Sequence, residues 1–231
     1  MTVWIILFLI VLVISFILAL ISMRDFPQSS QDLKTKYSLY LIRQTRNLTA
    51  EYFDTLHKSL ARTSFFVSFE RLIKGRKSAI CLFAPAEVAD ESPTLDLLEL
   101  EDYTLDISDE QSSVWEVGLK TPKSGLKITD SLFKNFPQLQ SSEQFFWQVI
   151  VKPKSGGFSC QIRAAVFSTD SKRRADLVKK LISLGGDLVK VPKPFSSSQL
   201  LNFYQNRTFL PHKLNPQLSN DEILRLIRLG F

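Results

Sequence analysis

The chain contains few of the side chains that bind metals or act as nucleophiles. Its 231 residues include two cysteines and two histidines. Cys81 and Cys160 stand in apolar runs, as is typical of buried free thiols in a reducing compartment. His57 falls in a predicted helix and His212 in a predicted loop, so these four side chains do not match the ligand spacing of a zinc site. We therefore expect no catalytic residue, no metal site and no cofactor.

Sequence motifs for phosphate transfer and acyl transfer are missing as well. Neither a G-x-x-x-x-G-K-[ST] loop nor a G-x-S-x-G elbow occurs. Residues 75–78 (GRKS) lack the upstream glycine of the first motif and stand at a predicted hairpin turn. A P-loop instead needs a helix start, where backbone amides surround the phosphate. These absences exclude a P-loop ATPase and a hydrolase of the G-x-S-x-G type.

Charged residues are absent from the first part of the chain, residues 2–22. A helix of about 20 apolar residues crosses the ~30 Å hydrocarbon core of a bilayer, so this run predicts a single membrane-spanning helix. No basic residue precedes the run and no small-x-small cleavage site follows it, which favours an uncleaved anchor over a signal peptide. Because five basic residues come soon afterwards, the positive-inside rule predicts a plasma-membrane protein with a cytoplasmic body; these are Arg24, Lys34, Lys36, Arg43 and Arg46.

The distribution of charge along the body is uneven. No Lys or Arg occurs in residues 81–119, which hold eleven acidic residues, whereas residues 120–231 hold eighteen basic and seven acidic residues. A basic surface of this kind attracts the anionic inner leaflet, nucleic acid or an acidic partner, unless the acidic surface of the same fold neutralises it. The candidate residues for binding an anionic partner are Lys172, Arg173, Arg174, Lys179 and Lys180.

Hydrophobic periodicity predicts an α+β body in which one order of elements occurs twice. Five segments are assigned: an anchor at 1–23, a linker at 24–36, a first half at 37–110, a second half at 111–210, and a C-terminal loop and helix at 211–231. Each half has the order β-α-β-β-α-β of a ferredoxin-like unit. The predicted elements include strands 37–43, 64–72, 78–84, 114–121, 145–152 and 158–168 and helices 49–61, 130–136 and 170–184.

The last predicted helix, residues 220–229, begins with a capping box formed by Ser219 and Glu222. Its apolar face contains Ile223, Leu224 and Ile227. These three residues are the candidate contacts for docking on a partner or on a second copy of the chain. Packing of the same face on the protein's own body is the alternative.

Several phrases of the sequence, taken in their order, resemble the amino-terminal domain of bacterial conjugative-transfer ATPases, which belong to type IV secretion-like machinery. The resemblance extends over residues 37–229, and the phrases that carry it are 50–60 (AEYFDTLHKSL), 67–70 (VSFE), 98–104 (LELEDYT), 147–153 (WQVIVKP), 158–165 (FSCQIRAA) and 218–229 (LSNDEILRLIRL). In that family the last phrase precedes the ATPase module, which this sequence lacks. The resemblance therefore implies assembly with a separately encoded ATPase rather than ATP hydrolysis.

From these features we expect a non-catalytic, membrane-anchored assembly or docking subunit of a type IV secretion-like or conjugative DNA-transfer complex. Its expected partners are the membrane, a transfer ATPase and further copies of itself. The alternative is a membrane-tethered nucleic-acid-binding module whose strand aromatics stack on bases. Adjacent strand residues point to opposite faces, and the RNA-recognition pattern is missing, so core packing is favoured for these aromatics: Phe65, Phe66, Phe145, Phe146 and Trp147.

Overall fold

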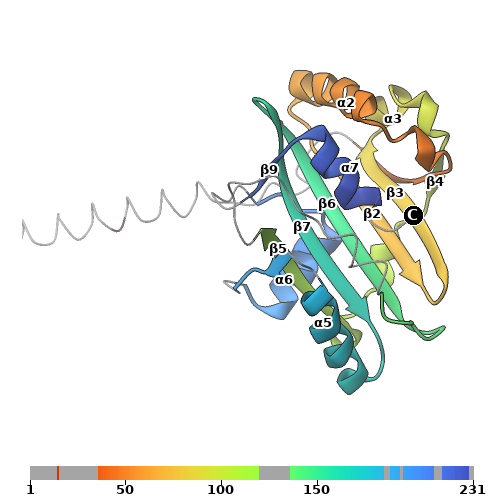
Figure 1. Cartoon of the computed structure of the whole chain (residues 1–231), viewed down its shortest axis with the longest axis vertical. Coiled ribbons are helices and arrows are strands. Elements are labelled where there is room, and N and C mark those ends of the chain that lie inside the picture. Colours follow the sequence, from red (N-terminus) through yellow and green to blue (C-terminus); the bar gives the residue numbers. More distant parts are fainter. Residues whose placement is uncertain are drawn as a thin grey trace, which may run out of the picture.

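Nine antiparallel strands form one sheet in the computed structural model, which describes Ser15 and residues 36–119, 136–184, 188–192, 195–210 and 215–228. The strand order is β4-β1-β3-β2-β6-β7-β5-β8, with β9 beside β7 (Figure 1). The strands are β1 (Tyr37–Ile42), β2 (Val67–Lys74), β3 (Lys77–Pro85), β4 (Leu97–Leu100), β5 (Ser112–Leu119), β6 (Gln144–Lys154), β7 (Gly157–Phe167), β8 (Leu188–Lys190) and β9 (Gln217–Leu218).

The sheet is continuous across the middle of the chain. Strands β4-β1-β3-β2 come from the first half and β8-β5-β7-β6 from the second, and the two sets meet where β2 pairs with residues 144–151 of β6. The predicted fold class, two ferredoxin-like halves behind a membrane helix, is therefore wrong. Periodicity within each half specifies its strands, but it does not reveal that β2 and β6, each at the end of its own set, pair with one another.

The same prediction placed a membrane helix in front of the body. In the part of the chain that the structure describes, no helix is long and apolar enough to cross a membrane, so no such helix is shown. The predicted span, residues 2–22, lies outside the described residues apart from Ser15. The predicted helix 130–136 also lies outside them, apart from Phe136.

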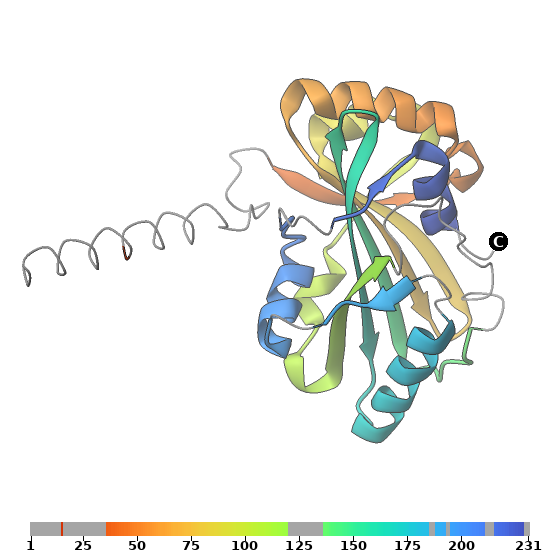
Figure 2. The same cartoon turned by 60° about the vertical axis from the view of Figure 1, so that its left-hand side comes forward.

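Helices cover both faces of the sheet (Figures 1 and 2). On the first face, helices α2 (Ala50–Thr63), α5 (Ser171–Leu184) and α7 (Asn220–Arg228) pack on a core that includes Phe69, Trp147 and Ile162. The short helix α3 (Ala86–Asp90) contributes Val88 to the same core. Because this core takes side chains from both sets of strands, the two halves share it.

The second face carries helix α6 (Ser197–Gln205), which begins with a capping box between Ser196 and Gln199. Its Leu200, Leu201 and Tyr204 pack on strand residues in a smaller apolar cluster. The predicted helices do not include this one. The second face also carries three of the buried charged residues, Glu70, Arg163 and Arg207.

A tight hairpin joins β6 and β7, which are paired along all of their length. Gly157 has φ +147°, and a Cβ on it would lie 2.5 Å from the carbonyl oxygen of Leu218. Only glycine therefore lets β9 approach β7 at this position. The pairing of β9 with β7 directs the chain into α7, which packs against α2 and β2.

Candidate functional site

A buried carboxylate lies at the centre of the second face. Glu70 of β2 is fully buried, although Phe69 and Arg71 beside it point to the other face. Its two oxygens accept hydrogen bonds from Ser68 (3.0 Å), Tyr103 (2.9 Å) and Gln148 (3.2 Å). A buried carboxylate needs such partners and a compensating cation, because burial strongly disfavours an unpaired charge.

Arg207 supplies that cation from the turn after α6. Its Nε lies 2.9 Å and its Nη2 3.1 Å from the two Glu70 oxygens, and the same guanidinium binds both oxygens of Asp102. The guanidinium also stacks 4.2 Å from the ring centre of Phe83. Burial opposes ionisation of Asp102, but the bonds and the charge of Arg207 outweigh it and lower the pKa of that carboxyl. The Arg207–Glu70–Asp102 set, hereafter the charged clamp, thus joins three distant segments.

A second buried arginine holds the end of α6. Arg163 of β7 donates to the carbonyl oxygens of Phe203 (3.0 Å) and Thr208 (2.6 Å) and to the side chain of Gln148 (3.3 Å). Burial lowers its pKa to about 10, with Glu116 as the nearby opposing charge. Both arginines therefore fix α6 and the following turn on the sheet.

The charged clamp has the composition of a structural element rather than of an acid–base site. The hydroxyl oxygens of Tyr103 and Tyr204 lie 2.6 Å apart. Burial, reinforced by Glu70, raises the pKa of both tyrosines well above its ordinary value, so they stay protonated. Every oxygen of Glu70 and Asp102 has a donor within the protein. The arrangement satisfies buried polar groups and has no nucleophile beside a base.

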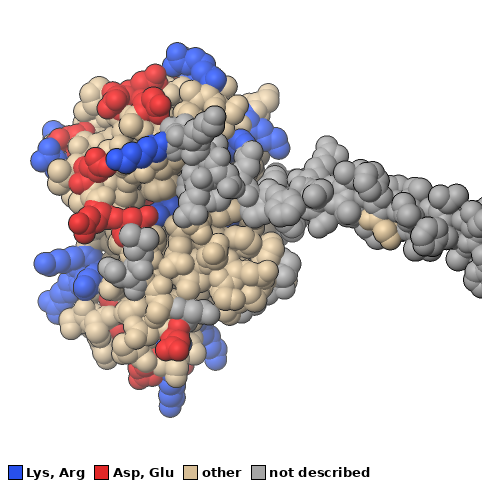
Figure 3. All heavy atoms as spheres, turned by 180° about the vertical axis from the view of Figure 1, so that it is seen from behind, with Lys and Arg blue, Asp and Glu red and all other residues tan. Residues whose placement is uncertain are grey.

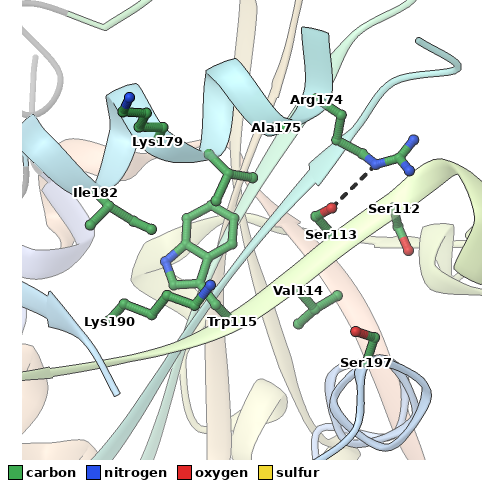
Figure 4. Close-up of a pocket in the computed structure, with 11 residues that line it drawn as sticks. Ser112, Ser113, Val114, Trp115, Arg174, Ala175, Lys179, Ile182, Lys190 and Ser197 are labelled. Atoms are coloured by element: carbon green, nitrogen blue, oxygen red, sulfur yellow. Dashed lines mark hydrogen bonds between the residues drawn. The ribbon is translucent and has the colours of Figure 1, made fainter. Parts of the chain in front are cut away.

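A cleft lies at the other end of the sheet, between α5 and α6. Strand β8 pairs with β5 only at residues 117–119, so among the described residues no strand lies on that side of residues 112–115. The cleft has a volume of about 600 Å³ (Figure 4). Its described lining combines basic, hydroxyl and apolar side chains and includes no acidic one. The basic and hydroxyl residues are Ser112, Ser113, Arg174, Lys179, Lys190 and Ser197, and the apolar ones include Val114, Trp115, Val178 and Ile182.

The structure divides the five candidate anion-binding residues into separate groups. Arg174 and Lys179 line the cleft. Arg173 lies on another side of α5, where its Nε is 2.9 Å from Glu143, so an acid already neutralises it. Lys180 lies on that same side with Asp176, and Lys172 is exposed. The five residues therefore do not form one continuous basic surface.

The three candidate docking residues of α7 belong to the protein's own core. Ile223 and Ile227 are buried, and Leu224 is partly buried against the same cluster. The side chain of Asn220 adds a hydrogen bond to Asp54 of α2 (2.6 Å). This is the intramolecular packing that the sequence left open as an alternative.

The structure also shows the surroundings of most side chains that the sequence analysis considered for metal binding and base stacking. Cys81 and Cys160 are buried, and burial raises the pKa of Cys81 to about 12. The Nε2 atom of His57 lies 3.0 Å from the carbonyl oxygen of Lys154, and His212 lies outside the described residues. The described part of the chain contains no cluster of three or more metal-ligating residues. Of the five aromatic residues considered for base stacking, four are buried and Phe65 is partly buried, so they offer no open platform for bases.

Exposed apolar residues occur instead on the edge strand β4. Leu98 and Leu100 are 46% and 37% exposed, and they are the large apolar side chains that stand out as exposed in the described part of the chain. Glu99 and Glu101 beside them are exposed as well. Figure 3, turned by 180° from Figure 1, shows acidic side chains, with basic ones between them, along the side of the molecule that carries β4. The sequence had indicated this acidity but not the edge position.

Comparison with models of known protein families gives no match, and a search of curated proteins finds no similar sequence.

Proposed function

We propose that the protein is a non-catalytic, membrane-attached docking subunit of a type IV secretion-like or conjugative DNA-transfer complex, and that it binds its partner through strand β4. The observation that carries this proposal is an apolar, acidic edge strand whose outer side pairs with no strand among the described residues. Proteins usually block such edges with lysine, proline or a covering element, because an open edge invites pairing with another chain.

The backbone of β4 is arranged for that kind of pairing. The N–H of Arg43 donates to the carbonyl oxygen of Asp96, and bonded positions alternate along an antiparallel ladder. The N–H and C=O groups of Leu97 and Glu99 therefore point away from β1. An extended segment added here would gain main-chain hydrogen bonds, while Leu98 and Leu100 would bury against its side chains.

The charge of β4 supports one kind of partner. Glu99 and Glu101 flank the exposed leucines, so a second β4 strand would place carboxylates near one another, which is unfavourable. An extended segment with alternating apolar and basic residues would instead complement the edge. We assign that segment to the separately encoded transfer ATPase that the resemblance implies. Dimerisation through β4 is the competing outcome of the experiment below.

Attachment to the plasma membrane is the second part of the proposal. It is supported by the uncharged run at residues 2–22, and the basic residues that follow the run support a cytoplasmic body. The nucleic-acid-binding alternative loses its support, because the strand aromatics are largely buried and Arg173 is paired with Glu143.

Replacing both exposed leucines, Leu98→Lys with Leu100→Lys, should abolish copurification of the transfer ATPase with the full chain from detergent-solubilised membranes. The change removes the apolar contact and places two cations opposite a basic segment. Because both side chains are exposed, the melting temperature should stay within about 2 °C of the unchanged protein. Copurification is measured by quantitative mass spectrometry of the affinity-purified complex.

The matched control is Glu51→Lys with Thr55→Lys on the exposed side of α2, which should leave copurification unchanged. Three results would overturn the proposal: no ATPase accompanies the unchanged chain, the leucine variant retains it, or the variant instead loses self-association through β4.

A further inference from the structure

We infer that the cleft between α5 and α6, at the open side of β5, binds a small organic phosphate. This inference concerns a different surface from the docking edge and does not depend on it. It rests on a buried hydroxyl without a hydrogen-bond partner, on the cations Arg174 and Lys179 in the cleft lining, and on the start of a helix at the same place.

Ser112 provides the first observation. Its side chain lies in the cleft wall and the residue is 8% exposed. Its Oγ has no hydrogen-bond partner among the described residues. A buried hydroxyl without a partner is unfavourable, and native proteins retain few of them. A ligand oxygen in the cleft would satisfy it.

The cations provide the second observation. Arg174 uses its Nε on Ser113 (3.2 Å) and its Nη1 on the carbonyl oxygen of Ser168 (2.6 Å). These two bonds fix the guanidinium at the mouth of the cleft, beside Ser112 (Figure 4), and leave Nη2 for a ligand. Lys179 adds a second cation to the cleft lining, which contains no acidic residue among those that the structure describes. A guanidinium that is fixed in place, with one nitrogen still able to donate, is suited to bind a phosphate oxygen.

The start of α6 provides the third observation. Ser197 is the first residue of this nine-residue helix and lines the cleft opposite Arg174. The Ser196 hydroxyl accepts a hydrogen bond from the N–H of Gln199, so the cap leaves the N–H of Ser198 directed out of the helix start. Helix starts favour anions through these groups and through the helix dipole.

The remaining lining defines the class of ligand. Val114, Val178 and Ile182 form an apolar wall, and the volume of about 600 Å³ is that of a small-molecule site rather than of a bare ion. The ligand is thus a phosphate group with a compact apolar part. Two sources share this chemistry: a free organic phosphate, and the head group of an anionic phospholipid.

The test titrates phenyl phosphate into the full chain in phosphatidylcholine nanodiscs and measures binding by calorimetry. We expect saturable binding to one site and weaker binding of inorganic phosphate. Ser112→Ala and Arg174→Gln should each weaken binding about tenfold, as the loss of a hydrogen bond to a charged group does. Lys172→Gln, on the exposed side of the same helix, should leave binding unchanged.

Ser112→Ala separates a ligand role from a purely structural one. Removing a hydroxyl without a partner should raise the melting temperature while lowering the affinity for phenyl phosphate. Nanodiscs with phosphatidylglycerol distinguish the sources: competition with phenyl phosphate identifies a lipid head group, and unchanged affinity identifies a free phosphate. Absence of saturable binding, or binding that neither Ser112→Ala nor Arg174→Gln weakens, would overturn the inference.

Discussion

Arg207→Leu should lower the free energy of unfolding by about 3–5 kcal/mol, because it leaves the buried Glu70 carboxylate without its cation. Glu70 and Arg207 have side chains that are 0% and 1% exposed, so water cannot replace the lost partner. Asp102, whose side chain is 29% exposed, can be hydrated and should add less to the loss. The measurement is urea denaturation of the full chain, followed by circular dichroism.

The double variant Glu70→Met with Arg207→Met is the matched control. Removing both charges leaves an apolar pair of similar length, and such replacements are far less harmful than breaking a buried pair. We expect the double variant to recover most of the stability that Arg207→Leu loses. A double variant as unstable as the single one would show that the guanidinium acts mainly through packing on Phe83 and not through charge.

Acid should also weaken the charged clamp. The pKa of Asp102 is lowered in the folded protein, so its stabilisation is fully present above the unfolded value of about 4 and is lost as the pH falls through the folded pKa. This acid sensitivity should diminish in Arg207→Leu, where the carboxyl no longer faces a cation.

Val149→Pro should unfold both halves of the protein in one step. Val149 is fully buried in β6, which pairs with β2 on one side and with β7 on the other. Proline removes a backbone donor from a central strand, where it is not tolerated. Because the first and second halves share one core, the cost should be about 4 kcal/mol or more, an exceptional value for one substitution.

Glu99→Pro is the comparison for that variant. In the unchanged protein the N–H of Glu99 points away from β1 on the edge strand, and sheets accept proline at such a position. The expected result is a melting temperature close to that of the unchanged protein. Hydrogen exchange of β3 decides the main prediction: slow exchange that persists in β3 of Val149→Pro would mean that the first half folds by itself.

Local patterns predicted much of the secondary structure. The hairpins β2–β3 and β6–β7 and the helices α2, α5 and α7 stand close to their predicted ranges, because their apolar periodicity is strong. The pairing of β2 with β6 was not predicted. Both strands are buried on two faces, so their sequences do not indicate which strand each one pairs with. Helix α6 was missed, because it is short and begins in a serine-rich stretch.

The candidate sites were predicted less well, for a reason that concerns tertiary structure. Glu70 and Arg207 are 137 positions apart and give no joint signal in the sequence. Asp102 is one of eleven acids in an acidic stretch, and its burial depends on the turn after α6. Glu70, a carboxylate within a predicted strand, was the one available signal in the sequence. Of the five basic candidates, only Arg174 and Lys179 lie in the cleft, because the helix turns the others to different sides.

Hydrogen exchange of β4 in the assembled complex tests docking through this edge most directly. The amides of Leu97 and Glu99 point away from β1 and should exchange rapidly in the isolated chain. Pairing with a partner strand should slow both amides strongly in the purified complex with the transfer ATPase, while Leu98 and Leu100, already bonded to β1, should change little. Equal exchange of Leu97 and Glu99 in the free and assembled protein would contradict docking through β4.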